Sequence, residues 1–390
     1  MSHDIHDLVT PSCTLLGLGE PTHQEPAFGR VRNALLARLA DRGFRSVALE
    51  TDRVAALRVD AYVQGGPGSL DSVMAEGFSH GFGEQAPHRE LVAWMRDHNA
   101  ARPAAERLAF HGFDTPTENY SAPSPRAALE HVLDYLGLGR DLGDTLAGFL
   151  GEDERWGRHE AVLDAAQSPG ATVGAARARA LADDLVTALH SRAPELIAAT
   201  SLAAWRRART HLTAGIGLLR YHRQCAEPGD RNARITRLLA TRDALMAENL
   251  LAIRDAEELR GPTVVFAHNL HLRRTPSTWS AGGIGATWTC AGGIVGALLG
   301  DRYVCVAGSV GRSEALGLTD PEPDTYEAFL QGRVDGRGPI VRADEVGGGR
   351  ERTGTDPAKG YFPLDRATLD GFDAVLHLPD AGAVAAPARV

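Results

Sequence analysis

The sequence contains few cysteines, and they are not spaced as a metal site would require. Cys13, Cys225, Cys290 and Cys305 are the four cysteines among 390 residues, and they lie far apart in the chain. Zinc sites typically draw their ligands from closely spaced pairs. Because two of the four lie within apolar, strand-like runs, we interpret all of them as reduced residues of the protein core.

The sequence also lacks a hydrophobic run of membrane-spanning length. Its longest apolar stretches are far shorter than the roughly 20 residues that a transmembrane helix needs. The first residues carry neither the basic flank nor the apolar segment of a signal peptide. We therefore expect a cytoplasmic protein with no membrane partner.

Positive charge is neither in excess nor clustered. The formal net charge is −9, and the arginines are scattered through helical stretches. This distribution argues against a surface that follows phosphate backbones, so we expect no nucleic-acid partner. The glycine-containing segments 281–288 and 291–300 lack the strand, turn and acidic residue of a dinucleotide-binding motif, and we expect no cofactor.

What the sequence does contain is an alternation of strand-like and helical segments. Helical patterns separate the first four strand-like runs, and this order predicts an α/β fold. We expect a three-layer α/β/α core around a largely parallel sheet. The apolar, strand-like runs are 13–18, 46–50, 107–111, 263–267, 303–307 and 374–378.

A long stretch between the third and fourth runs is almost entirely helical. It extends from residue 126 to residue 259. The chain also exceeds the roughly 250 to 300 residues at which single cores stop growing. We therefore predict an α/β core of residues 1–122 and 261–390, with a helical insertion of residues 123–260 forming one wall of a cleft.

Acidic and imidazole side chains follow the first two strand-like runs. Glu20 and His23 come after the first run, and Glu50 ends the second. Ligands of open α/β sheets bind beyond the carboxyl ends of the strands, so these side chains should face one cleft. A carboxylate beside an imidazole fixes the tautomer of the ring and raises its basicity, as proton abstraction requires.

The fourth run delivers two further histidines to the same edge. His268 and His271 follow that run directly and should share the cleft. Two histidines there can bind an oxyanion, transfer a proton or ligate a metal. Asp114, at the end of the third run, is a candidate for the same cleft. Arg242 lies on the last inserted helix, where polar residues would brace the strand-end loops.

Six short motifs occur in one order between about residues 15 and 310. They are Gly19-Glu20-x-Thr22-His23, the strand-end Glu50, Trp94-x-Arg96-x-x-Asn99, Gly112-x-Asp114, Arg242-Asp243-x-x-Met246-Ala247-x-Asn249 and Ala267-His268-Asn269-x-His271. In this set and order, the sequence resembles the erythromycin esterase family.

The resemblance implies an α/β core with a helical insertion that hydrolyses a small-molecule ester or lactone with water. His23 would be the general base, and Glu20 and Glu50 would orient and polarise the histidine or the water. His268 and His271 would stabilise the oxyanion or protonate the leaving alkoxide. The supporting residues would be Glu25, Arg30, Arg32, Asp114 and Arg242.

The sequence departs from the family pattern just after His23. The family usually has glycine at the next position and glutamate four residues beyond the histidine. Here Gln24 follows His23, Glu25 comes second and Ala27 fourth. Glu25 would have to act from another direction, and Gln24 adds bulk where a ligand could approach closely.

The residues leave other functions open. Ser309 follows a strand-like run in a segment resembling a nucleophile elbow, and His377 is the only later histidine. The Glu and His residues of the predicted cleft are also acceptable ligands for zinc or manganese in a metal-dependent hydrolase. The same fold could bind a ligand without turnover, or use the same base in a biosynthetic reaction.

Overall fold

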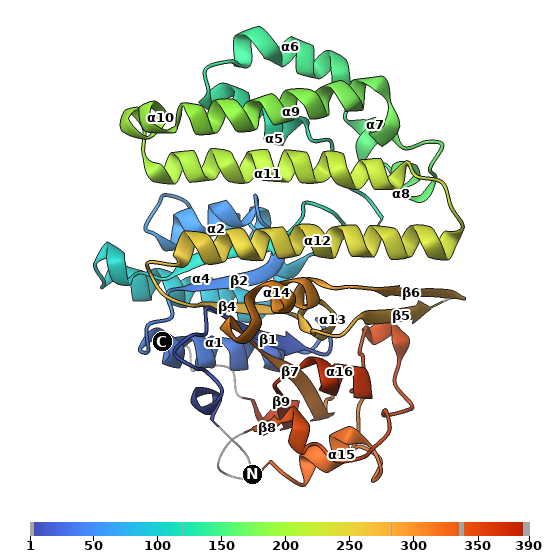
Figure 1. Cartoon of the computed structure of the whole chain (residues 1–390). Helices are drawn as coiled ribbons and strands as arrows, with labels where there is room; N and C mark the ends of the chain where they lie inside the picture. The colour runs from blue at the N-terminus through green and yellow to red at the C-terminus, as the bar shows by residue number, and fades with distance from the viewer. Residues whose placement is uncertain (1–3, 119, 282, 335–338, 385–390) are drawn as a thin grey trace.

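A seven-stranded sheet forms the centre of the lower part of the molecule (Figure 1). The computed structural model describes residues 4–118, 120–281, 283–334 and 339–384. Neighbouring strands pair in parallel, except that β8 is antiparallel to β9. In spatial order the strands are β3 (Ala109–Asp114), β2 (Ser46–Asp52), β4 (Thr263–His268), β1 (Leu15–Glu20), β7 (Tyr303–Arg312), β9 (Ala374–Asp380) and β8 (Ile340–Arg342).

Helices cover both faces of this sheet. Along β4, Val264 and Phe266 pack into one apolar cluster, whereas Val265 and Ala267 pack into the other. Strands buried on both faces are apolar at nearly every position, which explains the continuous runs in the sequence. The predicted three-layer α/β fold is confirmed.

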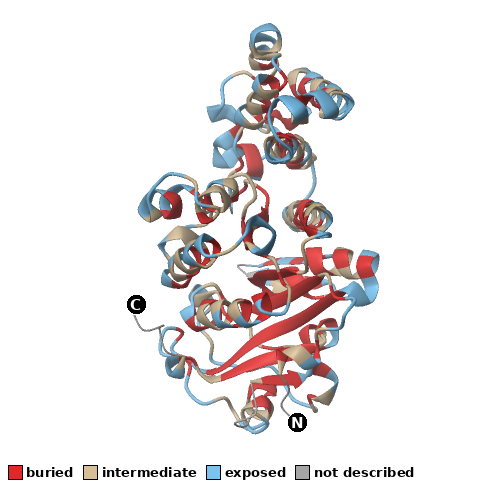
Figure 2. Cartoon of the chain, turned by 90° about the vertical axis from the view of Figure 1, so that its left-hand side faces the viewer, coloured by how far each residue is buried: buried red, intermediate tan, exposed pale blue. Residues whose placement is uncertain are grey.

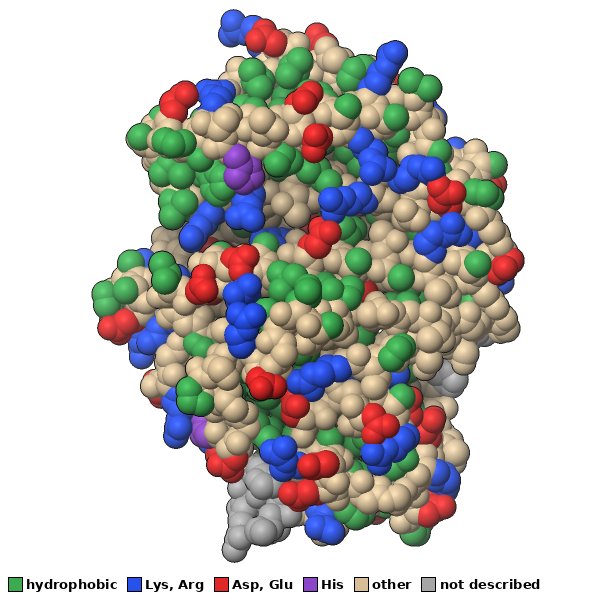
Figure 3. All heavy atoms as spheres, in the orientation of Figure 1, with side chains coloured by type: hydrophobic (Ala, Val, Ile, Leu, Met, Phe, Trp, Pro, Cys, Tyr) green, Lys and Arg blue, Asp and Glu red, His purple; other side chains and the backbone are tan. Residues whose placement is uncertain are grey.

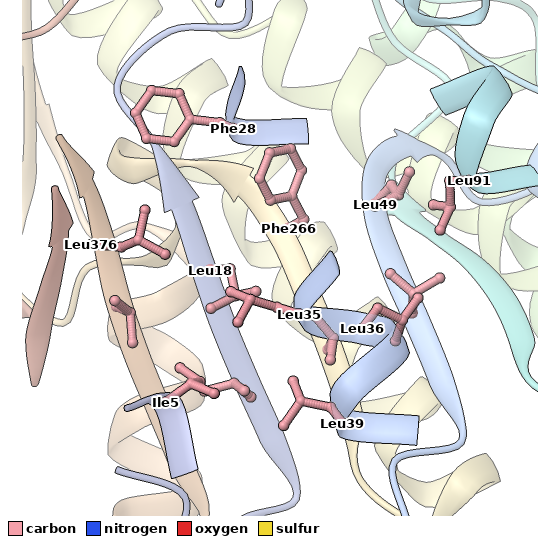
Figure 4. Packing of buried hydrophobic residues seen from close by; sticks show 14 of the residues in the cluster. Ile5, Leu18, Phe28, Leu35, Leu36, Leu39, Leu49, Leu91, Phe266 and Leu376 are labelled. Atoms are coloured by element: carbon pink, nitrogen blue, oxygen red, sulfur yellow. The ribbon is translucent and has the colours of Figure 1, made fainter. Parts of the chain in front are cut away.

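The first helical layer packs the N-terminal helices against β1, β2 and β4. Leu35 and Leu36 of α1 pack in one apolar cluster with Leu18 and Phe266 of the sheet, and Figure 4 shows Leu35 beside Leu18. Burial of such side chains contributes about 1.5 to 3 kcal/mol each. The helices of this part of the chain are α1 (Pro26–Ala40), α2 (Ala56–Val63), α3 (Leu70–Glu76) and α4 (Ala86–Ala100).

The opposite face is covered mainly by α12 (Arg231–Glu257) and by helices of the last third of the chain. Met246, Leu250 and Ile253 of α12 pack in one apolar cluster with the side chains that β4 and β7 direct toward this face of the sheet. A two-stranded hairpin also contacts α12. The remaining elements here are α13 (Asn269–Leu272), β5 (Ser277–Ala281), β6 (Ile284–Trp288), α14 (Ala291–Leu299), α15 (Tyr326–Gln331) and α16 (Arg366–Gly371).

The other inserted helices form a stack with an apolar core of its own. Trp156, Leu185, Leu189 and Trp205 are among its buried residues. Figure 2 shows this stack above the buried strands of the sheet. No helix in the described part of the chain is long and apolar enough to cross a membrane. The stacked helices are α5 (Arg126–Tyr135), α6 (Gly139–Leu150), α7 (Glu154–Gly157), α8 (His159–Leu163), α9 (Val173–Ser191), α10 (Ala193–Ala199) and α11 (Leu202–Cys225).

Several element boundaries differ from the sequence expectation. The first strand extends through Glu20, because its backbone pairs with β4 in a register that sets Glu20 beside His268. The four cysteines are buried and free, as expected of core residues. The hairpin β5–β6 and the edge strand β8 were not foreseen, since short strands of this kind carry little periodic signal.

Candidate active site

Four adjacent parallel strands end at one edge of the sheet and deliver acidic or imidazole side chains there. In the order β3, β2, β4, β1, they carry Asp114, Glu50, His268 and Glu20 near their carboxyl ends. These four side chains are buried. Since the strands are parallel neighbours, the topology itself brings together residues that are up to 248 positions apart in the sequence.

His23 lies in the turn between β1 and α1 and is the most accessible member of the group. Its Nδ1 is 2.8 Å from Oε1 of Glu20, and its side chain is 33% exposed. A carboxylate can only accept, so Nδ1 carries a proton, and Nε2 holds the lone pair whenever the ring is neutral. That Nε2 is 3.8 Å from Oε1 of Glu50. Burial lowers the pKa of His23, but the carboxylates of Glu50 and Glu20 outweigh it and raise the pKa overall.

Glu50 is the carboxylate on which the other groups converge. Its Oε2 accepts from the backbone N–H of His268 at 2.9 Å. Its Oε1 lies 3.3 Å from both Nη2 of Arg242 and Nε2 of His271. Burial alone would raise the pKa of Glu50, but the charges of His271 and His23 hold it well below the usual range. Glu50 is therefore ionised.

His271 is held between two carboxylates. Its Nδ1 is 2.8 Å from Oδ1 of Asp243, while its Nε2 faces Glu50. Asp243 is fixed in turn, because it accepts from the indole N–H of Trp288 at 2.7 Å and from the backbone N–H of Ala291 at 2.8 Å. Burial opposes protonation, yet Asp243 and Glu50 raise the pKa of His271 well above its ordinary value. The ring is an imidazolium.

His268 differs from its neighbours in being neutral. Its Nδ1 accepts from the backbone N–H of Leu270 at 3.1 Å, and its Nε2 donates to the carbonyl of Pro21 at 3.1 Å. Burial and the charge of His23 lower its pKa to about 3. The ring of His268 lies 5.4 Å from that of His23, centroid to centroid. His268 thus ties the end of β4 to the turn that carries His23.

Arg242 links α12 to the sheet edge through Asp114. Its Nε and Nη2 donate to the two carboxylate oxygens of Asp114 at 3.0 and 2.5 Å. His80 bonds the same carboxylate from the other side, with its Nε2 2.8 Å from Oδ2. Burial would raise the pKa of Asp114, but Arg242 and His80 lower it to about 2.

These side chains form one connected cluster of charges and imidazoles, and comparison with known proteins assigns the chain to a family. The family model described as erythromycin esterase matches residues 39–381. The chain belongs to the erythromycin esterase family. The match confirms the resemblance that the sequence motifs indicated. Glu20 and His23 precede the matched range, so their place in the cluster is shown by the geometry.

Solved structures share the fold over nearly their whole length. A Bacillus cereus protein superposes with a TM-score of 0.67 at 20% identity, over 95% of this chain and 89% of that one. A succinoglycan biosynthesis protein gives 0.65 at 18% identity, over 95% and 88%. A histidine-to-asparagine variant of the erythromycin esterase EreC, in its open conformation, gives 0.64 at 19% identity, over 96% and 92%. No curated protein matches the chain by sequence.

Arg30 and Arg32 were both expected to support the site, but only one of them lies near the cluster. The buried guanidinium of Arg32 bonds Asn33 and the carbonyl of Pro87, and its charge reaches Glu20. Arg30, in contrast, lies 3.7 Å from Glu90 of α4. The structure thus places the charge of Arg32 within electrostatic reach of Glu20 and leaves Arg30 outside the cluster.

The structure does not bring Glu25 into the cluster. Its carboxylate caps α1 by accepting from the backbone N–H of Ala27 at 3.1 Å, and it also accepts from the hydroxyl of Ser313. Capping satisfies one of the free N–H groups in the first turn of a helix, which explains the acidic residue here. Glu25 therefore has the structural role of a helix cap and not the expected supporting role.

Two contributors were missed as site residues from the sequence. Asp243 belongs to the Arg-Asp motif of the family resemblance but is not among the predicted site residues, although its position beside Arg242 is a usable signal. His80 is the only non-glycine residue with a left-handed backbone in the described part of the chain, with φ of 58°. Its Nδ1 also contacts Glu118 at 2.8 Å, so the ring bridges two carboxylates. Such strain often accompanies functional positions.

Aromatic rings from two distant segments lie against His23 and His268. Phe82 lies 4.9 Å from the ring of His23, and Phe362 lies 4.9 Å from the ring of His268, centroid to centroid. The backbone N–H of Phe362 donates to the carbonyl of Pro21 at 2.9 Å. A segment near residue 360 is therefore joined to the turn that carries His23.

The Ser309 alternative has an unfavourable geometry. Ser309 and His377 lie side by side on β7 and β9, where Oγ is 3.0 Å from Nδ1. Nε2 of His377 is 2.8 Å from the amide oxygen of Gln331, and both Ser309 and His377 are buried. Burial lowers the pKa of His377 to about 3. This chain of hydrogen bonds lies inside the core.

We expect the Ser309→Ala variant to keep its full hydrolytic activity. The hydroxyl is buried in the sheet beside Nδ1 of His377, which would lose its partner, so its removal costs about 1 to 3 kcal/mol of stability. Rates with any accepted ester, measured after circular dichroism has confirmed folding, check this expectation. A folded but inactive variant would replace the His23 mechanism with an acyl-serine mechanism.

Proposed function

We propose that the protein hydrolyses a carboxylic ester or lactone, using a water molecule that His23 activates. Membership of the erythromycin esterase family supports hydrolase activity. The observation that carries the proposal is the fixed tautomer of His23. Glu20 accepts a hydrogen bond from Nδ1–H, and this leaves a basic Nε2 on a partly exposed ring beside Glu50.

The first step is proton transfer to His23. A water bound at Nε2 also lies within reach of Oε1 of Glu50, because these two atoms are 3.8 Å apart. Nε2 takes one proton from the water, and the water oxygen forms a bond to the carbonyl carbon of the ester. The carboxylates of Glu20 and Glu50 stabilise the imidazolium that results.

The second step expels the alcohol. The tetrahedral oxyanion collapses, the carbon–oxygen bond to the alkoxide breaks, and the alkoxide takes the proton back from His23. His271 and Arg242, which meet at Glu50, supply the positive charge that stabilises the developing oxyanion in this mechanism. In this conformation the Nε2–H of His268 is bonded to Pro21, so its use for the oxyanion requires that bond to be shared.

The test is a panel of macrolactones and simpler esters analysed by mass spectrometry. A substrate should gain the mass of one water, and the products should be an acid and an alcohol, or the opened hydroxy acid. If the folded protein binds members of the panel and none gains water, the hydrolase proposal fails. A product of unchanged mass would instead indicate a rearrangement driven by the same base.

We expect activity to survive exhaustive chelation. Nδ1 and Nε2 of both His268 and His271 already face hydrogen-bonding partners. Among the described residues, no group of three or more His, Cys, Asp or Glu side chains is arranged to hold a metal ion. Rates before and after dialysis against a chelator check this prediction. Loss of activity that added zinc or manganese restores would favour the metal-dependent alternative.

A further inference from the structure

A short segment from the last third of the chain lies against the turn between β1 and α1. We call this segment, residues 358–362, the strap. The hydroxyl of Thr22 donates to the carbonyl of Lys359 at 2.9 Å. The backbone N–H of Phe362 donates to the carbonyl of Pro21, also at 2.9 Å. Because Pro21 and Thr22 are buried, the bonds between the turn and the strap are shielded from water.

The strap is also fixed to the core by bonds that do not involve the turn. Oε1 of Glu327, on α15, accepts from the hydroxyl of Tyr361 at 3.3 Å and from the backbone N–H of Leu364 at 2.9 Å. All three residues are buried. Figure 3 shows acidic and basic side chains side by side on the surface over α15 and α16. The strap is therefore anchored by specific buried bonds and not by a surface charge of one sign.

The carbonyl of Pro21 accepts two hydrogen bonds from distant parts of the chain. In the described part of the chain its donors are the N–H of Phe362 and Nε2 of His268, which lies 3.1 Å away. A carbonyl oxygen has two lone pairs and can accept both. His268 has one proton to give, because its ring is neutral and its Nδ1 accepts from the backbone N–H of Leu270.

The two donors differ in how the proposed reaction treats them. His268 can offer its N–H to the oxyanion of the substrate only by weakening or breaking its bond to Pro21. A buried carbonyl that loses every donor pays a desolvation penalty. The N–H of Phe362 belongs to the anchored strap, so it stays in place when the imidazole turns.

We propose that the N–H of Phe362 is a positioning group, which keeps the Pro21 carbonyl bonded while His268 turns its own N–H toward the substrate oxyanion. This inference rests on the proposed ester hydrolysis. In the resting site both donors bind the carbonyl, and in the transition state Phe362 binds it alone. The strap acts here through its backbone, so the effect does not depend on the phenyl ring.

The experiment is a double-mutant cycle on kcat, with the full chain and an ester that it hydrolyses. Phe362→Ala removes the ring and keeps the N–H, whereas Phe362→Pro removes both, so the comparison of these variants isolates the N–H. We expect kcat of Phe362→Pro to be about tenfold below that of Phe362→Ala. KM should differ by less than about twofold, because only the transition state leaves the carbonyl without a donor.

The same two variants in a His268→Ala background separate positioning from a structural role. Without the imidazole no donor is released in the transition state, so the two variants should have equal kcat there. A tenfold gap in both backgrounds would show that the N–H only supports the fold. Equal rates in the wild-type background would show that it is not needed. Either result overturns the inference and leaves ester hydrolysis in place, whereas a wild-type chain that hydrolyses no ester ends both.

Should Phe362→Pro misfold, heteronuclear NMR of the wild-type chain with a phosphonate analogue of the ester decides the question. The phosphonate oxygens stand in for the oxyanion. We expect the Nε2–H resonance of His268 to shift on binding, while the amide of Phe362 continues to exchange slowly with solvent. Faster exchange at Phe362, or an unmoved resonance of His268, would contradict the proposal.

Discussion

The His23→Asn variant is expected to lose ester hydrolysis almost completely, by roughly a thousandfold in kcat, within the range for general acid–base catalysis. Asparagine can still donate a hydrogen bond to Glu20, but it offers no basic nitrogen in place of Nε2. Affinity for a non-hydrolysable amide analogue of the substrate should stay close to that of the wild type. Single-turnover kinetics and equilibrium binding measure the two effects separately.

The matched control is the same substitution at an exposed histidine. His190 lies at the end of α9, where its Nδ1 contacts only a backbone carbonyl of its own helix at 2.8 Å. His190→Asn should keep wild-type rates. A His23→Asn variant that folds and still hydrolyses its substrate at more than a tenth of the wild-type rate would show that another group is the base.

The Glu50→Gln variant is expected to lose activity by about a hundredfold and to shift the pH profile. His23 acts as a base only when neutral, and Glu50 helps to raise its pKa. In the wild type, kcat/KM should therefore rise with pH through a midpoint above 6.5, the ordinary pKa of histidine. Removing the charge of Glu50 removes part of that rise, so the midpoint should move to lower pH.

The pH shift distinguishes an electrostatic role from a structural one. A variant that is merely misfolded would lose amplitude without moving the midpoint. Glu195→Gln, at a fully exposed position on α10, is the control and should change neither the rate nor the profile. A Glu50→Gln profile with an unchanged midpoint would contradict the role assigned to Glu50 beside His23.

The meeting of Glu20, Glu50, His268 and Asp114 could be predicted because it follows from topology. Parallel strands in one sheet end at the same edge, so polar residues at successive strand ends must converge there. The register between β1 and β4 is an example of this convergence, because it places Glu20 and His268 side by side. Sequence reasoning needed only the strand ends, which apolar runs mark well.

The remaining partners depend on packing that no local pattern encodes. Asp243 reaches His271 because of the rotation of α12 against the sheet, and Phe362 reaches His268 from an irregular segment. Glu25 shows the opposite error. It was included because it stands near His23, but the unpaired backbone N–H groups at the start of α1 determine where its side chain points.

Helix α12 makes the helical insertion indispensable to the chemistry of the core. It follows α11 in the predicted insertion, yet it packs on β3 and supplies Arg242 and Asp243 to the cluster. A chimaera that exchanged the whole segment 123–260 with a relative would carry the Arg–Asp pair on a foreign helix, whose packing on β3 would have to be re-established. Exchange of residues 123–225 alone would replace the outer helices and leave the pairs of Arg242 with Asp114 and of Asp243 with His271 intact. The segment that can be exchanged without disturbing the cluster thus ends in the loop before α12.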